Sequence, residues 1–259
     1  MVRASVIGCG NMGSALVRGL SRTGNHTVIA CDVDPDALES VAEDCAETTT
    51  DPAAAAADAD IVFVAVKPGL VVDVVSELDL SPEQTLVSIA AGVPTTVLEE
   101  YTDATLVRIM PNLAAETGNM AAAATGADIP DDVEAALDDV GEFVEVDEAQ
   151  MDIATAVNGS GPAFVFYLIG AMKDAGVDAG LEPEDAEVLA AQTFKGAAET
   201  VLRSDASIDE LIDAVCSPKG TTIEGMEVLW DSTVGETVGE AVTAAETRSA
   251  ELRREFDDE

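Results

Sequence analysis

The sequence predicts an α/β protein with two domains, and three observations lead to this fold class. Short runs of β-branched residues alternate with helical stretches from Ala4 to about Val146, which is typical of a mainly parallel sheet covered by helices. A glycine-rich turn follows the first of these runs. Strand signals stop after Glu148, and the remainder offers only helix-length segments. We therefore expect an α/β domain at 1–149 and an all-helical domain at 150–259.

The elements of the first domain are predicted from local pattern. Runs rich in Val, Ile and Thr predict strands at Ser5–Ile7, Thr27–Cys31, Ile61–Val66, Thr85–Ile89, Leu106–Met110 and Phe143–Val146. Helices are expected between them at Met12–Arg22, Pro35–Asp44 and Asp131–Val140. The alanine run at 53–57 is interpreted as a further helical segment.

The charge of the chain limits its partners. Twelve Lys and Arg residues stand against 51 Asp and Glu residues, so the formal net charge is −39. A field of this sign repels nucleic acid and anionic membranes alike. The acidic residues are spread along the whole chain, which argues against a disordered acidic tail. Because 1 M salt screens charges beyond roughly 3 Å, we interpret the composition as halophilic, an adaptation to a salty cytoplasm.

The first motif that carries chemistry is VIGCGNMG, in which Gly8, Gly10 and Gly13 form a G-x-G-x-x-G between strand and helix. In a dinucleotide-binding turn, the first glycine allows the turn, the second admits the pyrophosphate, and the third packs helix against strand. Asp32 ends the second strand, 19 residues after Gly13. The pattern predicts a Rossmann-type cofactor site. The alternative is a glycine-rich turn of structural use only.

Three later strands also end on turns, and an open α/β sheet binds its ligand at the carboxyl ends of its strands. Lys67 can reach a phosphate or ribose oxygen there, and Asn112 can offer an amide near the nicotinamide. The alternatives are that Lys67 only caps its strand and that Asn112 only forms its turn. The expected cofactor-binding residues are Gly8, Gly10, Asn11, Met12, Gly13, Asp32, Ala65, Val66, Lys67, Pro68, Ala91, Gly92 and Asn112.

The stretch ACDVDPD after the second strand bears on the choice between NAD and NADP. Asp32 can accept hydrogen bonds from the ribose 2′- and 3′-hydroxyls, whereas a 2′-phosphate meets like charge. No arginine lies in this stretch, so a phosphate clamp is missing from it. We expect NADH to be tolerated or preferred, unless Lys67 or Arg3 reaches the phosphate. The alternative is that Asp32 caps the following helix, which is compatible with either cofactor.

The second domain contains a segment, PAFVFYLIGAM at 162–172, that is apolar on every face and must therefore be buried on all sides. The remaining helices can hardly surround it, which favours a partner subunit over a central helix in a monomer. Just before it, NGSGPAF at 158–164 permits close backbone approach, either to a ligand or to another helix. No uninterrupted apolar run reaches the roughly 18 residues of a membrane span, and we expect a cytoplasmic protein.

Acid–base and metal chemistry have few candidates. The single histidine, His26, lies just before the second strand, at the end of the sheet opposite the cofactor turns. No Ser/His/Asp or Cys/His arrangement can be built without it. The four cysteines show no metal spacing and are interpreted as reduced structural thiols. Hydride transfer to an already cationic centre, such as a protonated imine, needs little acid or base from the protein.

The stretch SPKGTT at 217–222 lies among acidic residues and precedes a predicted helix at Thr222–Trp230. Exposed N–H groups at a helix start form an anion site, which Lys219 strengthens. Ser217 or Thr221 can bind a carboxylate together with the backbone, which leaves Thr222 to hydrogen-bond a nitrogen. The alternative is a capping turn between two helices, with Lys219 simply exposed.

Taken together, GCGNMG, AVKP, AAG, MPN, GSGPAF and SPKGTT, in this order and spacing, resemble pyrroline-5-carboxylate reductases over roughly residues 4–254. The first motif is shared with many dehydrogenases, whereas the last two in combination are highly specific. The resemblance implies a Rossmann domain and a helical domain that interlocks in a homodimer, often assembled into a decamer. It implies reduction of 1-pyrroline-5-carboxylate to L-proline with NADH or NADPH, the final step of proline biosynthesis.

The resemblance also implies roles for single residues. Ser217, Gly220 and Thr221 would hold the substrate carboxylate, Thr222 would be the catalytic contact to the imine nitrogen, and Glu148 would lie near the ring.

Two positions depart from the family pattern. Lys219 stands where glycine is usual, which matters because glycine there can serve a positive φ. Ala214 stands where many members carry Asn, which would shift a substrate hydrogen bond elsewhere.

Two rival hypotheses remain open on the sequence alone. A deazaflavin-dependent nicotinamide reductase can share the N-terminal half, but it does not account for SPKGTT. A non-catalytic nucleotide-sensing protein would keep the cofactor fold, but the intact glycine turn and the Thr221-Thr222 pair speak against it.

Overall fold

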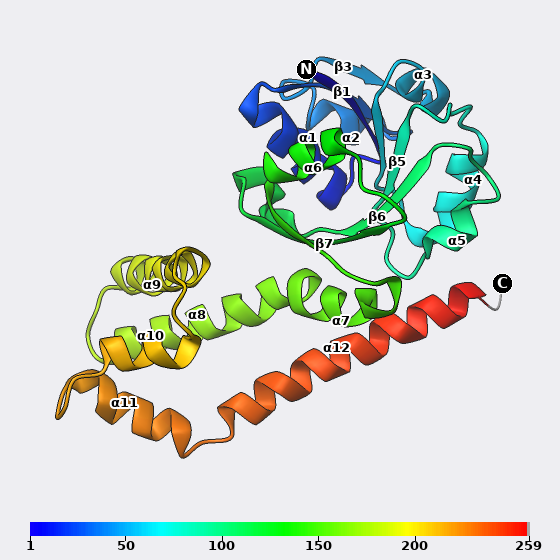
Figure 1. Cartoon of the computed structure of the whole chain (residues 1–259). Coiled ribbons are helices and arrows are strands. Elements are labelled where there is room, and N and C mark those ends of the chain that lie inside the picture. Colours follow the sequence, from blue (N-terminus) through cyan, green and yellow to red (C-terminus); the bar gives the residue numbers. More distant parts are fainter. Residues whose placement is uncertain (258–259) are drawn as a thin grey trace. The chain divides into compact units, whose positions relative to one another are not determined.

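The computed structural model describes residues 1–257, which form two compact units (Figure 1). One unit comprises residues 1–160 together with the segment that begins at Thr243, and the other is Gly161–Val242. The predicted class, an α/β sheet followed by helices, is confirmed. The expected domain boundary after residue 149 falls in the first turn of a continuous helix, Glu148–Asp178, and it stays a prediction.

An eight-stranded sheet forms the centre of the first unit. Its order is β3-β2-β1-β4-β5-β6-β7-β8, and neighbouring strands are parallel except β6 and β7. The order reverses between β1 and β4, which is where a doubly wound sheet leaves a crevice for a ligand. The strands are β1 Val2–Ile7, β2 His26–Cys31, β3 Glu47–Thr49, β4 Ile61–Val64, β5 Thr85–Ser88, β6 Thr105–Met110, β7 Met120–Gly126 and β8 Gly141–Glu145.

Helices cover both faces of this sheet and bury a separate apolar cluster on each (Figure 1). Leu16 and Leu137, from α1 and α6, pack with Val6 and Phe63 on one face. Val75 and other residues of α3, α4 and α5 pack on the opposite face. The helices of this part are α1 Asn11–Thr23, α2 Pro35–Glu39, α3 Pro52–Ala56, α4 Val71–Ser76, α5 Thr95–Leu98 and α6 Asp131–Asp138, with single turns η1 Pro68–Leu70 and η2 Leu113–Thr117.

Two strands were not expected from the sequence. β3 is only three residues long, and β7 reads MAAAATG, whose alanines favour a helix when taken alone. Here β7 lies between β6 and β8, and Ala122, Ala123 and Ala124 are buried, so pairing and packing override local propensity.

Helix α2 ends at Glu39, five residues before the end of the expected helix Pro35–Asp44. The guanidinium of Arg18 donates to the carbonyl of Ser40 at 3.0 Å, and the amide of Asp44 bonds the carbonyl of Val41 instead. The carbonyl that would continue the helix at this point is therefore bonded to another helix.

The second unit is helical, and α8 packs against α9 within it. Of residues 161–242, only Ala186 and Ala190 are buried, while Phe166 and Tyr167 are 70% and 78% exposed. This unit therefore lacks an apolar core of its own. The remaining elements are η3 Glu148–Gln150, α7 Met151–Ala154, a π-turn η4 Thr155–Gly159, α8 Gly161–Asp178, α9 Pro183–Arg203, α10 Ile208–Val215, α11 Thr221–Trp230 and α12 Val234–Asp257.

One helix in the described part of the chain, Glu148–Asp178, is long and apolar enough to cross a membrane by length and composition. That property is weak evidence for a membrane, because the core helix of a soluble protein meets it too.

Candidate functional site

In the glycine turn after β1, two of the three positions admit only glycine. Gly8 has φ +98°, and a Cβ there would lie 2.8 Å from the carbonyl carbon and oxygen of Ala65. A Cβ at Gly13 would lie 1.8 Å from the carbonyl oxygen of Gly8. At Gly10, by contrast, a Cβ would meet nothing within 4 Å. The first and third glycines thus serve the turn and the packing of α1, and the second faces open space.

That open space lies at the start of α1, whose first turn has no side-chain cap. Gly10 is the N-cap, and Asn11, the first helical residue, is exposed. Free N–H groups at a helix start attract an anion. The turn therefore fits the pyrophosphate of a dinucleotide, and a side chain at Gly10 would occupy the space that the pyrophosphate needs.

Asp32, at the end of β2, is tied to the same turn. Its Oδ2 accepts the backbone N–H of Cys9 at 2.6 Å, and its Oδ1 accepts the N–H of Asp34 at 2.9 Å. The N-cap of α2 is Asp34, whose Oδ1 accepts the N–H of Asp36 at 3.0 Å. The helix is therefore capped by Asp34, and Asp32 fixes a negative charge beside the glycine turn.

Arg18 on α1 was not singled out from the sequence. It lines a pocket of about 370 Å³ together with Gly10 and Asn11. Its guanidinium bonds the Ser40 carbonyl at 3.0 Å and lies 3.2 Å from the carboxylate of Asp44. Its partners are more than 20 residues away along the chain, so no local pattern marks it.

The other expected cofactor residues follow the ends of neighbouring strands. The N–H of Ala65 donates to the carbonyl of Ile7 at 2.7 Å, which joins the turns after β1 and β4. Lys67 is exposed, and no ion pair is found for it among the described residues. A Cβ at Gly92 would lie 3.2 to 3.4 Å from backbone atoms of Leu252 and Arg253, so this turn contacts the end of α12. Val66 and Pro68 flank Lys67, and Ala91 precedes Gly92.

Glu148 is paired with a buried arginine that was also missed. Arg108, on β6, is 1% exposed, and its Nη1 bonds Oε1 of Glu148. Oε2 of Glu148 and two nitrogens of Arg108 are buried without a hydrogen-bond partner. One carboxylate oxygen of Glu148 is thus occupied by the protein itself, and its expected role near a substrate ring stays a prediction.

The cysteines near the glycine turn are poor nucleophiles. Burial, followed by the charge of the nearby Asp32 carboxylate, raises the pKa of the Cys9 thiol to about 12. Burial, followed by the charge of Asp32, raises the pKa of Cys31 to about 11. Both thiols stay protonated at neutral pH and are free of disulfides, in line with a structural role. No cluster of metal-ligating side chains occurs in residues 1–257.

His26 lies where the sequence placed it. It pairs with Val2 at the start of β1, whereas the glycine turn follows the end of that strand. Its Nε2 bonds Asp139 at 2.8 Å. The amide of Asn25, and then His26, lower the pKa of the Asp139 carboxyl. This pair joins β2 to the end of α6, away from the glycine turn.

The expected substrate residues of the C-terminal half belong to the second unit. Lys219 has φ +61° and is the one non-glycine residue with a positive φ in the described chain. The N–H of Gly220 donates to the carbonyl of Ser217 at 2.8 Å, and a Cβ at Gly220 would lie 2.3 Å from the Ser217 hydroxyl oxygen. Gly220 is the N-cap of α11, without a side-chain cap. Thr221 and Thr222 therefore begin a helix whose first N–H groups are available to an anion.

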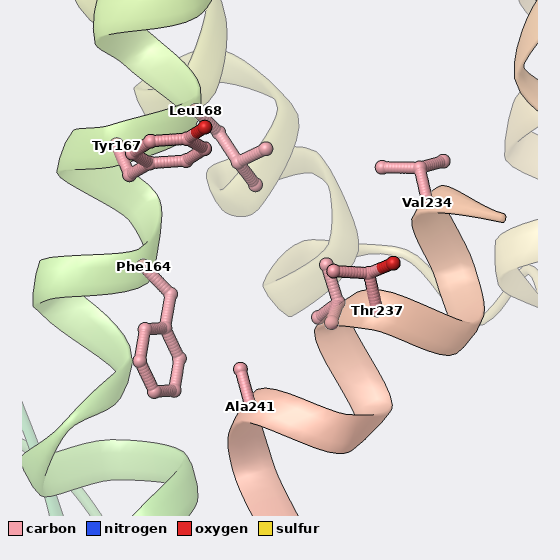
Figure 2. Close-up of a pocket in the computed structure, with 7 residues that line it drawn as sticks. Phe164, Tyr167, Leu168, Val234, Thr237 and Ala241 are labelled. Atoms are coloured by element: carbon pink, nitrogen blue, oxygen red, sulfur yellow. The ribbon is translucent and has the colours of Figure 1, made fainter.

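Two of the apolar hollows in the second unit bear on its function. Thr222 lines one of about 460 Å³, together with Leu211 and Met226. A smaller one of about 180 Å³ lies between α8 and the first turns of α12 (Figure 2). Phe164 and Leu168 line it from α8, and Val234 from α12. Both hollows are apolar and open, and the one between α8 and α12 is of the kind that a further polypeptide covers.

Comparison with known proteins bears on both units. A family model described as "Pyrroline-5-carboxylate reductase dimerisation" matches residues 148–252. A second, described as "NADP oxidoreductase coenzyme F420-dependent", matches residues 3–92. The pyrroline-5-carboxylate reductase of Methanosarcina acetivorans is 40% identical, over 95% of this chain and 96% of its own.

Solved structures of pyrroline-5-carboxylate reductases are similar to this chain over nearly its full length. The pyrroline-5-carboxylate reductase of Coxiella burnetii has a TM-score of 0.87 and 31% identity, covering 97% of this chain and 98% of its own. The Plasmodium falciparum pyrroline carboxylate reductase with NADP bound has a TM-score of 0.82 and 28% identity, with the same coverage.

Proposed function

The chain belongs to the pyrroline-5-carboxylate reductase family, and on that premise we propose that it reduces 1-pyrroline-5-carboxylate to L-proline by hydride transfer from NADH or NADPH. The observation that carries the proposal is the presence, in one chain, of two helix starts without a side-chain cap, each with N–H groups available to an anion. One follows a dinucleotide-type glycine turn, and the other carries Thr221 and Thr222. The two rival hypotheses do not explain the second helix start or the match over residues 148–252.

The first helix start suits the cofactor. The N–H groups at the start of α1 bind the pyrophosphate, Asp32 accepts the adenosine ribose hydroxyls, and the exposed Lys67 meets phosphate or ribose oxygens. A bound nicotinamide dinucleotide supplies the hydride. Because the glycine turn and Asp32 are held by backbone contacts, the site needs little rearrangement to receive the cofactor.

The second helix start suits the substrate. The carboxylate of 1-pyrroline-5-carboxylate accepts hydrogen bonds from the N–H group of Thr221 and from the Ser217 hydroxyl. Gly220 keeps that hydroxyl accessible, because a Cβ there would lie 2.3 Å from its oxygen. Lys219 adds a positive charge in a protein of net charge −39. Thr222 hydrogen-bonds the imine nitrogen, and the apolar hollow that it lines receives the ring carbons. No residue needs to act as a strong acid or base, because the imine carries its own proton.

The molecule works as a homo-oligomer. Residues 148–252 match a dimerisation domain, and the exposed apolar residues of α8 need a cover. We propose a homodimer that can assemble further into a decamer, in a salty cytoplasm that screens its negative charge.

A steady-state assay tests the proposed function. Purified protein is mixed with 1-pyrroline-5-carboxylate and either NADH or NADPH, and the loss of absorbance of the reduced cofactor is followed. We expect consumption that depends on both substrate and protein. A protein that consumes neither cofactor would contradict the proposal.

A further inference from the structure

The side chain of Asn158 bonds two strands far from it in sequence. Asn158 lies in the π-turn Thr155–Gly159, and its Nδ2 donates to the carbonyl oxygens of Met110 at 2.5 Å and Ala121 at 2.9 Å. Because both partners are acceptors, the atom that faces them must be the amide nitrogen. Met110 ends β6, and Ala121 is the second residue of β7. The last pair in the register of these antiparallel strands is Met110 with Ala123, so Asn158 bridges them where they begin to separate.

Asn112 completes this arrangement with hydrogen bonds to Asn158 and Ala121. Its Nδ2 donates to the backbone carbonyl of Asn158 at 3.1 Å. Its Oδ1 accepts the N–H of Ala121 at 3.4 Å and that of Ala114 at 3.1 Å. The backbone of Ala121 is therefore held at its N–H by Asn112 and at its carbonyl by Asn158. We call these contacts the Asn112–Asn158 brace.

The π-turn is what brings Asn158 to this position. The N–H of Ser160 bonds the carbonyl of Thr155, five residues back, so one extra residue is accommodated in the turn. Turns of this kind occur often at functional sites. The helix that contains it is also attached to β6 at its start, because Glu148 is bonded to the buried Arg108.

We propose that Asn158 is a positioning residue that, through Asn112, holds the end of β6 for the nicotinamide half of the cofactor. This inference rests on the proposed function. In a doubly wound sheet, the two halves of a dinucleotide lie on either side of the point where the strand order reverses. Asp32, which follows β2, marks the adenosine side, so the nicotinamide side is that of β4, β5 and β6. Asn112 lies in the turn after β6, and the sequence places it near the nicotinamide. The Asn112–Asn158 brace holds the side chain of Asn112 in position.

The test compares binding of the whole cofactor with binding of the same molecule without its nicotinamide. NADH and ADP-ribose are titrated by calorimetry into wild type, Asn158→Ala and Asn158→Asp; if wild type binds only the phosphorylated cofactor, NADPH and 2′-phospho-ADP-ribose replace them. Asn158→Asp keeps the shape of the side chain but removes both N–H donors. The control is Asn119→Ala, whose side chain bonds only Thr117 in a local turn.

We expect the Asn158 variants to bind NADH about tenfold more weakly, since small displacements of a positioned group have effects of ten- to a hundredfold. The affinity of the Asn158 variants for ADP-ribose should stay within about twofold of the wild-type affinity. Asn119→Ala should bind both ligands with the wild-type affinity. If an Asn158 variant fails to fold by circular dichroism, Asn158→Ser, which keeps one donor, gives the same comparison.

A parallel loss of affinity for NADH and ADP-ribose would mean that the brace only supports the fold, and it would overturn the inference. Unchanged NADH binding would do the same. Because binding needs no turnover, a wild type that binds NADH without reducing 1-pyrroline-5-carboxylate would overturn the proposed function and leave this test intact. A wild type that binds no dinucleotide would overturn both.

Discussion

The Asp32 carboxylate accepts the backbone N–H of Cys9 at 2.6 Å, so the end of β2 is bonded directly to the glycine turn. This contact fixes a negative charge where an adenosine ribose would lie. Arg3 cannot neutralise that charge, because it lies at the start of β1, where its guanidinium donates to the carbonyl of Asp58. Arg18 lies on α1, but its guanidinium is bonded to Ser40 and Asp44.

Asp32 is therefore expected to set the preference between NADH and NADPH. Wild type should use NADH at least as well as NADPH, because a 2′-phosphate meets like charge at Asp32. In Asp32→Ser, the ratio of kcat/KM for NADPH to that for NADH should rise about tenfold, which corresponds to ~1.4 kcal/mol. This ratio is measured for wild type and for Asp32→Ser at low and high salt, because salt weakens the repulsion between Asp32 and the 2′-phosphate.

Asp138→Ser serves as the comparison variant and should leave the ratio of kcat/KM for the two cofactors unchanged. It removes an exposed carboxylate at the end of α6, beside Asp139 and His26 and away from the glycine turn. A strong NADPH preference of the wild type at low salt, where repulsion is greatest, would rule out this role of Asp32.

Thr222→Ala should fold and bind cofactor but turn over on the order of 100-fold more slowly, because a preorganised hydrogen bond to the reacting group is lost. Thr221→Ala should instead raise the KM for 1-pyrroline-5-carboxylate, since Thr221 belongs to the carboxylate site. Thr247→Ala is the control, because its hydroxyl only bonds the Thr243 carbonyl within α12. A wild-type turnover rate in Thr222→Ala would contradict the assignment of Thr222 as the contact to the imine nitrogen.

Lys219→Gly should separate a backbone effect from a charge effect. Lys219 has φ +61°, which a glycine adopts without strain, so the free energy of unfolding should rise by about 1 kcal/mol. The KM for the substrate should rise as well, because a positive charge beside the carboxylate site is lost. Urea unfolding and steady-state kinetics measure the two quantities. A less stable Lys219→Gly would show that the turn does not need a positive φ here.

The exposed face of α8 should be a subunit interface. Phe166 and Tyr167 are 70% and 78% exposed in one chain, so replacing both with Glu should dissociate the oligomer and abolish most activity. Tyr101→Glu, at an exposed aromatic residue of the first unit, is the matched control and should stay assembled. Sedimentation at working concentration measures the mass. A wild type that is monomeric and fully active would contradict the interface.

The parts of the fold that the sequence predicted well depend on neighbours along the chain. The strands before the glycine turn and Asp32 are short apolar runs, and the turn needs glycines at fixed offsets, so both leave a local pattern. β7 was missed because its alanines carry no strand preference of their own, and its pairing with β6 and β8 decides its structure.

Site residues, too, were predicted where a local pattern marks them and missed where distant contacts decide their role. Gly8 was identified from its place in the G-x-G-x-x-G pattern, and Lys219 because it departs from a motif, and both features are visible in the sequence itself. Arg108 and Asn158 were missed because their partners lie 37 to 48 residues away, and no local spacing connects them. A charged residue inside the apolar strand TLVRIM is the one signal that could have pointed to Arg108.

In the proposed reaction, a hydride passes from C4 of the nicotinamide to the C=N carbon of the substrate. The measurement that tests it most directly follows deuterium from cofactor carrying deuterium on the transferred face of nicotinamide C4. Product is analysed by mass spectrometry and proton NMR. L-Proline that carries one deuterium at C5, formed in step with loss of reduced cofactor, is the predicted result. Proline without deuterium, or cofactor oxidation without proline, would contradict the account.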